Sequence, residues 1–182
     1  LYYHPANYKT LFIIAFFPGA IAILFTLFIK EKRLKKNADL KKEKWSFFAI
    51  FSYWKNSPAE YKRLLIGLLL FAAFNSSDVF LLLRMKESGL TDTAVIGVYI
   101  FYNLAFALLA YPIGILADKI GLKKVFLAGL FVFAIVYAGF GVNNNLIIFF
   151  LLFFLYGLYA AATEGISKAW ISHIVSEKET AT

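Results

Sequence analysis

Long apolar runs alternate along the chain with polar connections. Five runs are apolar almost throughout, and each is long enough to cross a bilayer as a helix, which takes roughly 17–25 residues. A helix that is apolar on all its sides at this length is typical of a membrane span. The pattern therefore predicts an all-α integral membrane protein with five transmembrane helices, at Thr10–Ile29, Leu64–Leu83, Ala94–Leu116, Val125–Val142 and Leu146–Thr163.

The connections between these runs differ in length. Three are short, Arg84–Thr93, Ala117–Lys124 and Gly141–Asn145, and they force neighbouring helices to run antiparallel. One is long, Lys30–Arg63, and it separates the first span from the other four.

The composition supports a membrane protein. The chain is 61% hydrophobic, whereas soluble domains are about 45–50% apolar. It has no cysteine, which excludes disulfides and thiolate metal sites. A net charge of +8 also occurs in proteins that bind nucleic acids. Here, however, 11 of the 19 Lys and Arg residues lie in Lys30–Arg63, between two apolar spans, which is typical of a cytoplasmic loop of a membrane protein. We therefore expect a lipid bilayer, and no nucleic acid, around this chain.

Basic residues also predict the orientation. Sixteen of them fall in 30–63, 117–124 and the tail from Lys168, and only three on the opposite side. The positive side of a membrane protein faces the cytoplasm. This asymmetry predicts a multi-pass protein of the inner (plasma) membrane, with 30–63 and 117–124 cytoplasmic.

The long connection contains an aromatic stretch, Trp45–Trp54, flanked by lysines on both sides. Phe47, Phe48, Phe51 and Trp54 share one helical face, which favours a short helix on the cytoplasmic membrane surface. Packing against another protein surface is the alternative. The chain starts at Leu1 with no charged segment before its first apolar run, so we expect a fragment of a longer protein and no signal peptide.

Asp78 is the ionisable residue inside an expected span. A carboxylate there costs roughly 2.5–3.5 kcal/mol, so it usually faces the interior of a bundle. Two interpretations stay open: a cavity carboxylate that binds a cation or substrate or carries a proton, and a carboxylate that packs helices together. Asn75 lies one turn away. Tyr99 and Asn103, at about the same depth in the next span, are expected either to share that polar surface or to hydrogen-bond between helices.

The sharpest motif follows the third span and reads Gly114-Ile-Leu-Ala-Asp118-Lys119-Ile-Gly121-Leu-Lys123-Lys124. By itself it contains a helix end, an acid that can cap backbone N–H groups or meet cations, a glycine for a tight turn, and cations. It resembles the loop signature of the major facilitator superfamily, except at Leu122, where that family often has a basic residue. The stretches Phe74–Arg84 and Tyr156–Gly165 also resemble bacterial members of this family.

That resemblance implies a twelve-helix fold of which this chain holds helices 6–10. Residues 1–29 would be the last helix of the N-terminal half, 30–63 the central loop, and 64–182 the first four helices of the C-terminal half. It further implies a cytoplasmic gate, in which Glu164 meets Lys119, Lys123 or Lys124. A local pair of Glu164 with Lys168 is the alternative.

The function that the resemblance implies is secondary active transport of a small solute by alternating access, of the efflux type and proton-coupled. A non-transporting membrane protein, such as a channel, receptor or membrane-embedded enzyme, is the alternative. No ATP-binding or hydrolase motif occurs, and His4 and His173 have no ligand spacing around them. We therefore expect no enzymatic activity, cofactor or metal.

Overall fold

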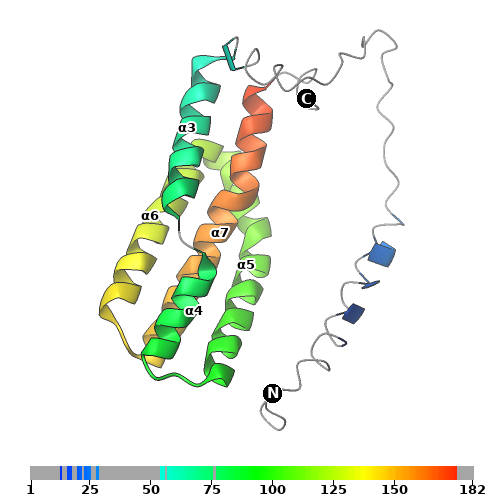
Figure 1. The fold of residues 1–182 in the computed structure, drawn as a ribbon. Coiled ribbons are helices and arrows are strands. Elements are labelled where there is room, and N and C mark those ends of the chain that lie inside the picture. Colours follow the sequence, from blue (N-terminus) through cyan, green and yellow to red (C-terminus); the bar gives the residue numbers. More distant parts are fainter. Residues whose placement is uncertain are drawn as a thin grey trace. The chain divides into compact units, whose positions relative to one another are not determined.

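A computed structural model of the chain describes residues 57–75 and 77–175, with positions 13, 16, 17, 20, 21, 23–25, 28, 54 and 55 (Figure 1). The chain divides into two compact units, Leu1–Ala49 and Ile50–Thr182. In the first unit, the described positions from 13 to 25 are helical. The expected span Thr10–Ile29 lies largely outside the described residues, and so does nearly all of the expected surface helix Trp45–Trp54.

The second unit consists of helices connected by short turns. Within the described residues it contains no strand. Four of its apolar segments are long enough to cross a membrane by length and composition, with α3 and α4 together forming the first of them. This confirms the all-α class and four of the five expected spans. The helices are α3 (Ala59–Phe74), α4 (Asp78–Glu87), α5 (Asp92–Ile120), α6 (Leu122–Val142) and α7 (Leu146–Ile174).

The expected span Leu64–Leu83 is not one continuous helix. Helix α3 ends at Phe74, Asn75 and Ser77 have extended backbone with ψ of 124° and 146°, and α4 begins at Asp78. The Ser77 side chain caps α4 by accepting a hydrogen bond from the Val79 N–H at 3.4 Å. Asn and Ser compete for backbone hydrogen bonds and so favour helix ends over helix interiors. The polar residues within the apolar run therefore interrupt the helix.

The connection expected at Ala117–Lys124 is mostly helical, which corrects the prediction of a loop there. Helix α5 continues to Ile120 and α6 begins at Leu122, so Gly121 alone links them. Gly121 has φ of +103°, a conformation that residues with a Cβ rarely adopt. A glycine is therefore required for this one-residue turn.

Helix α7 is the central helix of the unit. It packs against α5, α6 and α3, and more than half of its most apolar stretch is buried. Gly157 permits close approach to α5, because a Cβ there would lie 3.0 Å from the Phe106 backbone nitrogen. Gly129 of α6 permits close approach to α7, since an added Cβ there would lie 2.9 Å from Ala162 Cβ. Small residues at such contacts are common in membrane bundles.

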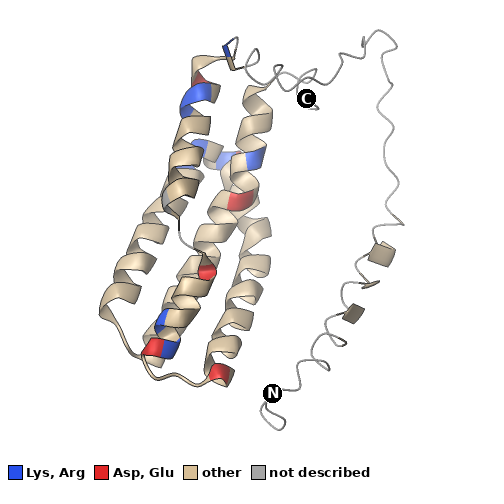
Figure 2. Ribbon diagram, viewed as in Figure 1, with Lys and Arg blue, Asp and Glu red and all other residues tan. Residues whose placement is uncertain are grey.

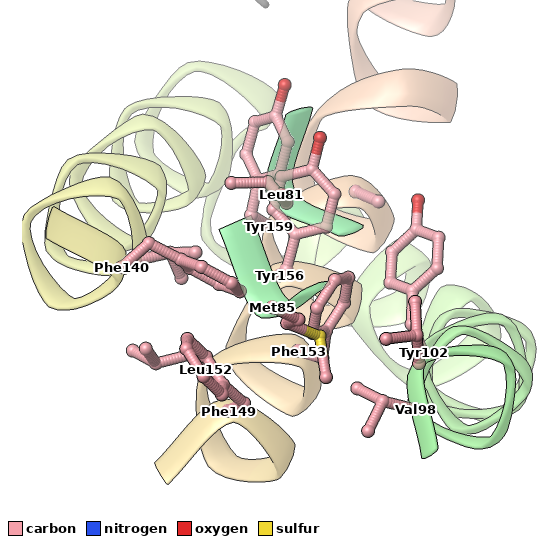
Figure 3. Packing of buried hydrophobic residues seen from close by; sticks show 13 residues of the cluster. Leu81, Met85, Val98, Tyr102, Phe140, Phe149, Leu152, Phe153, Tyr156 and Tyr159 are labelled. Atoms are coloured by element: carbon pink, nitrogen blue, oxygen red, sulfur yellow. The ribbon is translucent and has the colours of Figure 1, made fainter. Parts of the chain in front are cut away.

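The main core joins α4, α5, α6 and α7 near the ends where the α4–α5 and α6–α7 turns lie. Leu81 and Met85 anchor the short helix α4 in this core, where Met85 is fully buried. Figure 3 shows these side chains beside the aromatic rings of α7 and α5. The short helix α4 is thus fixed to the bundle by apolar packing. Its buried partners include Val98, Tyr102, Phe140, Phe149, Leu152, Phe153 and Tyr156.

Candidate functional site

Asp78 lies at the first position of α4, directly after the interruption of the first span. At about 1.5 Å per residue it lies about 8 Å from Leu83, the end of the expected span, and is therefore inside that span. The positive end of the α4 dipole stabilises a carboxylate in this first turn. The local structure thus places an acid at a helix start inside an apolar span.

One oxygen of this carboxylate is held by another helix. The Tyr156 hydroxyl of α7 donates a hydrogen bond to Asp78 Oδ1 at 2.6 Å. Asp78 Oδ2 has no protein partner among the described residues, and it is not one of the fully buried unpaired atoms. Asp78 therefore packs helices together through one oxygen and presents the other at the surface of the unit.

Asn75 lies on the other side of the interruption, at the end of α3. Its backbone N–H bonds to Phe71 O at 2.8 Å. Its side-chain oxygen, Oδ1, is buried and has no hydrogen-bond partner in the described part of the chain. A buried acceptor without a donor is costly, by roughly 1–3 kcal/mol. Asn75 and Asp78 therefore both present unused acceptors around the same helix interruption.

Tyrosine rings surround the Asp78 contact and form a continuous row across α5 and α7. Tyr99 stacks on Tyr102 with ring centres 5.7 Å apart, Tyr102 meets Tyr156 at 5.2 Å, and Tyr156 meets Tyr159 at 5.3 Å. Figure 3 shows the hydroxyl oxygens of Tyr102, Tyr156 and Tyr159 on the same side of the cluster. We call Tyr99, Tyr102, Tyr156 and Tyr159 the tyrosine row.

The structure connects only part of the residue set expected at this depth. Tyr99 is 37% exposed and reaches Asp78 indirectly, through Tyr102 and Tyr156. Asn103 is exposed, and its side-chain N–H donates to Tyr99 O of its own helix at 2.8 Å. The only side-chain hydrogen bond that the described residues give Asn103 is thus within α5, and not between helices.

The loop signature lies across the end of α5 and the start of α6. Gly114, Asp118 and Lys119 belong to α5, Gly121 is the turn, and Lys123 and Lys124 belong to the first turn of α6. Asp118 does not cap α6, because Gly121 is the N-cap and no side chain caps it. This corrects the expectation of a capping carboxylate.

Beside the signature is a cavity of about 240 Å³. Its wall is formed mainly by alanines and glycines of α5 and α7, including Gly114 and Gly165, with Asp118 at its edge. Added methyl groups at Gly114 or Gly165 would meet nothing within 4 Å.

Glu164 of α7 is exposed, and so are Asp118 and the lysines of the signature. Ion pairs within 4 Å join only Arg84 to Glu87 and Lys86 to Asp92 in the described part of the chain. Neither the expected contact of Glu164 with the signature nor the local pair with Lys168 forms there. Figure 2 shows that most charged residues gather toward the ends of the helices.

Arg84 connects the turns at the opposite end of the unit, a role that the sequence did not indicate. Its Nε donates to Phe140 O at 3.3 Å and its Nη2 to Asn144 Oδ1 at 2.8 Å. A cation at this position satisfies carbonyls at the end of α6 and complements the helix dipole. Arg84 thus joins the end of α4 to the α6–α7 turn.

Replacing Arg84 with alanine is expected to lower the free energy of unfolding by about 2 kcal/mol, because it removes charge-assisted hydrogen bonds. Arg84→Lys should recover less than half of this loss, since one ammonium group cannot replace the planar guanidinium fork. Thermal unfolding of the purified full-length protein measures both. Lys86→Ala is the control, since its pair with Asp92 joins groups that are 52% and 72% exposed and should contribute less than about 1 kcal/mol. Equal losses in Arg84→Ala and Lys86→Ala would contradict this role of Arg84.

Together, the long apolar helices and the interrupted first span define a multi-pass α-helical membrane protein with a carboxylate inside a span. Residues 83–182 match the family model of the Major Facilitator Superfamily. The chain belongs to the major facilitator superfamily.

A named relative agrees with this family. The chain is 32% identical to an uncharacterized MFS-type transporter of Methanocaldococcus jannaschii, over 99% of this chain and 45% of the relative. It thus spans a little under half the length of that relative. No solved structure matches the chain at a significant level.

Sequence reasoning missed Tyr156 as the partner of Asp78. The stretch that begins at Tyr156 was notable only for its family resemblance, and aromatic residues in membrane helices are mostly packing residues. One feature could have indicated the contact. A tyrosine hydroxyl that is buried in a membrane helix needs a hydrogen-bond partner, and Asp78 is the acid at the corresponding depth.

Proposed function

We propose that the complete protein is a secondary transporter that moves a small solute by alternating access, of the efflux type and coupled to protons. In this proposal the second unit supplies one wall of a central solute pathway. Family membership and the relative named as a transporter support transport as the general function. Asn75, Asp78, Tyr99 and Asn103 are the proposed pathway residues.

The observation that carries the proposal is the open carboxylate oxygen of Asp78 at the interruption of a membrane helix. Interrupted helices occur in transporters where backbone and side chains bind solutes or ions near the middle of the membrane. A structural carboxylate would be expected to use both of its oxygens in hydrogen bonds. Among the described residues, Asp78 Oδ1 accepts a hydrogen bond from Tyr156 and Oδ2 has no partner.

Two-sided accessibility tests alternating access directly. Asn103 is exposed on α5, and a cysteine introduced there in the full-length protein should react with an impermeant thiol reagent from either side of sealed vesicles. Cross-linking the cytoplasmic ends of the helices should then stop labelling from the inside and keep labelling from the outside. Labelling from one side only, before any cross-link, would contradict the proposal.

We also propose that the protein lies in the plasma membrane with 30–63 and 117–124 on the cytoplasmic side, as the basic asymmetry indicates. Cysteines at Thr93 and at Asn37 should then label from opposite sides of sealed cells. Thr93 is exposed at the start of α5, and it is a better probe than Asn144, whose side chain accepts the Arg84 hydrogen bond. Labelling of both positions from the same side would contradict this orientation.

The signature and Glu164 form the proposed cytoplasmic gate, built of Gly114, Asp118, Lys119, Gly121, Lys123, Lys124 and Glu164. In the described residues their charged groups are exposed and make no ion pair with one another, so in this proposal their partners lie elsewhere in the complete protein. Only contacts that differ between the two states can shift their populations.

We therefore expect Asp118→Ala or Glu164→Ala to raise the fraction of the inward-open state and to slow transport, while affinity for the solute changes little. Reactivity of a cysteine at Ser172, an exposed position at the same end of α7, measures that fraction from inside. Matched alanine variants at exposed Thr93 and Asp92, at the opposite end, should leave it unchanged. If both gate variants keep the wild-type cysteine reactivity at Ser172 and the wild-type transport rate, the gate proposal is wrong. The motif would then serve only folding or membrane topology.

A further inference from the structure

We infer that Asp78 and the tyrosine row form a binding site for a monovalent organic cation with an apolar body. This inference rests on the proposed transport function and names the class of solute that this half of the pathway takes. It starts from Asp78 Oδ2, which has no hydrogen-bond partner among the described residues, and from Asn75 Oδ1, which is buried and unpaired among them. Such oxygens accept hydrogen bonds, so the complementary ligand is a donor or a positive charge.

The charge around the site favours a cation. On α4 the basic side chain nearest to Asp78 is Arg84, about 9 Å further along the helix axis, and it donates to Phe140 O and Asn144 Oδ1 instead. The Tyr156 hydroxyl donates to one carboxylate oxygen, and Asp78 lies in the first turn of α4, at the positive end of the helix dipole. An anionic carboxylate in a weakly polar environment attracts a cation more strongly than it would in water.

The tyrosine row favours an organic cation over a bare metal ion. Tyr99, Tyr102 and Tyr156 form a continuous chain of aromatic rings, with neighbouring ring centres 5.7 and 5.2 Å apart, that leads from exposed Tyr99 to the carboxylate. Aromatic faces bind quaternary ammonium and similar cations through their quadrupole. The described residues contain no group of three or more His, Cys, Asp or Glu side chains that could hold a metal ion.

The outer end of the row is accessible to a ligand. Tyr99 is 37% exposed, whereas Tyr156 is 2% exposed and holds the carboxylate in place. Tyr156 is therefore a positioning residue for Asp78, and Tyr99 is the ring that a bound cation contacts.

Equilibrium binding to the purified full-length protein tests this site with two probes of the same shape and opposite charge, tetraphenylphosphonium and tetraphenylborate. We expect the cation to bind and the anion to bind at least about tenfold more weakly. Asp78→Asn should weaken binding of the cation at least tenfold and leave the anion unchanged. Glu87→Gln, which makes the same charge change at the exposed end of α4, is the matched control and should bind as wild type.

A second pair of variants keeps the test decisive if Asp78→Asn fails to fold. Tyr99→Leu should weaken cation binding about two- to fivefold, as expected for an exposed cation–π contact, and Tyr99→Phe should keep wild-type affinity. Equal binding of both probes, equal effects of Leu and Phe at Tyr99, or displacement of the organic cation by sodium but not by choline would overturn the inference. These binding outcomes are independent of the two-sided labelling at Asn103, so failure of this site and failure of alternating access are distinguishable.

Discussion

Replacing Asp78 with asparagine is expected to lower solute transport at least about tenfold in the full-length protein while leaving its fold intact. The amide oxygen of asparagine can still accept the hydrogen bond from Tyr156, which is 2.6 Å long in the wild type. The substitution therefore removes the carboxylate inside the span and keeps the contact between α4 and α7. A tenfold change in rate corresponds to about 1.4 kcal/mol of barrier, which is modest for a charged group in a membrane.

Flux into proteoliposomes, measured with and without a pH gradient, gives the rate, and thermal unfolding gives the stability. Tyr156→Phe is the matched variant, because it keeps the charge and removes the hydroxyl. We expect it to lose about 1–3 kcal/mol of stability and a smaller share of transport. Transport at the wild-type rate over a range of pH in Asp78→Asn would leave the carboxylate with a packing role alone. Failure of the variant to insert or fold would also count against a role in the pathway.

The second large effect is expected at Gly157, where α7 packs closely against α5. A Cβ at this position would lie 3.0 Å from both Ala105 Cβ and the Phe106 backbone nitrogen, and 3.2 Å from Tyr102 O. Two of these three atoms belong to the backbone and cannot rotate away. Gly157→Ala should therefore cost about 1–3 kcal/mol of stability, and Gly157→Val should cost more.

The control for this substitution is Gly141→Ala at the end of α6, where an added Cβ meets nothing within 4 Å. Its midpoint of thermal unfolding should stay close to that of the wild type. Because Tyr102 and Tyr156 lie in the same contact, Gly157→Ala should also disturb the tyrosine row and weaken the Asp78 contact. Equal stability of the two alanine variants would show that α5 and α7 are not packed as closely as described.

Apolar run length predicted the helices well because it reflects a single physical requirement, the burial of backbone polar groups inside each span. It could not predict the interruption at Asn75 and Ser77, since a run of this length with one acid also fits a continuous helix. Nor could it predict that the signature is helical up to Ile120, because its polar residues look like a loop until the one-residue turn at Gly121 is known.

The candidate site was predictable only in its parts. Asp78 is visible in the sequence because an acid in an apolar run is costly. Its partner Tyr156 is 78 residues away, and their contact depends on how α4 and α7 pack, which no local pattern encodes. Arg84 was visible as a charge near the end of a span, but its bonds to Phe140 and Asn144 also depend on tertiary packing.

The contrast between the two connections in this unit has a mechanical consequence. Gly121 is the only residue between α5 and α6, so a tilt of one helix at that end must tilt the other. Helices α3 and α4 are separated by extended residues inside a span, so their angles are less directly coupled. Helices α5, α6 and α7 are therefore expected to move together, whereas α3 can change its angle to α4. Such a change would alter the surroundings of Asp78 and leave the packing of α5, α6 and α7 intact.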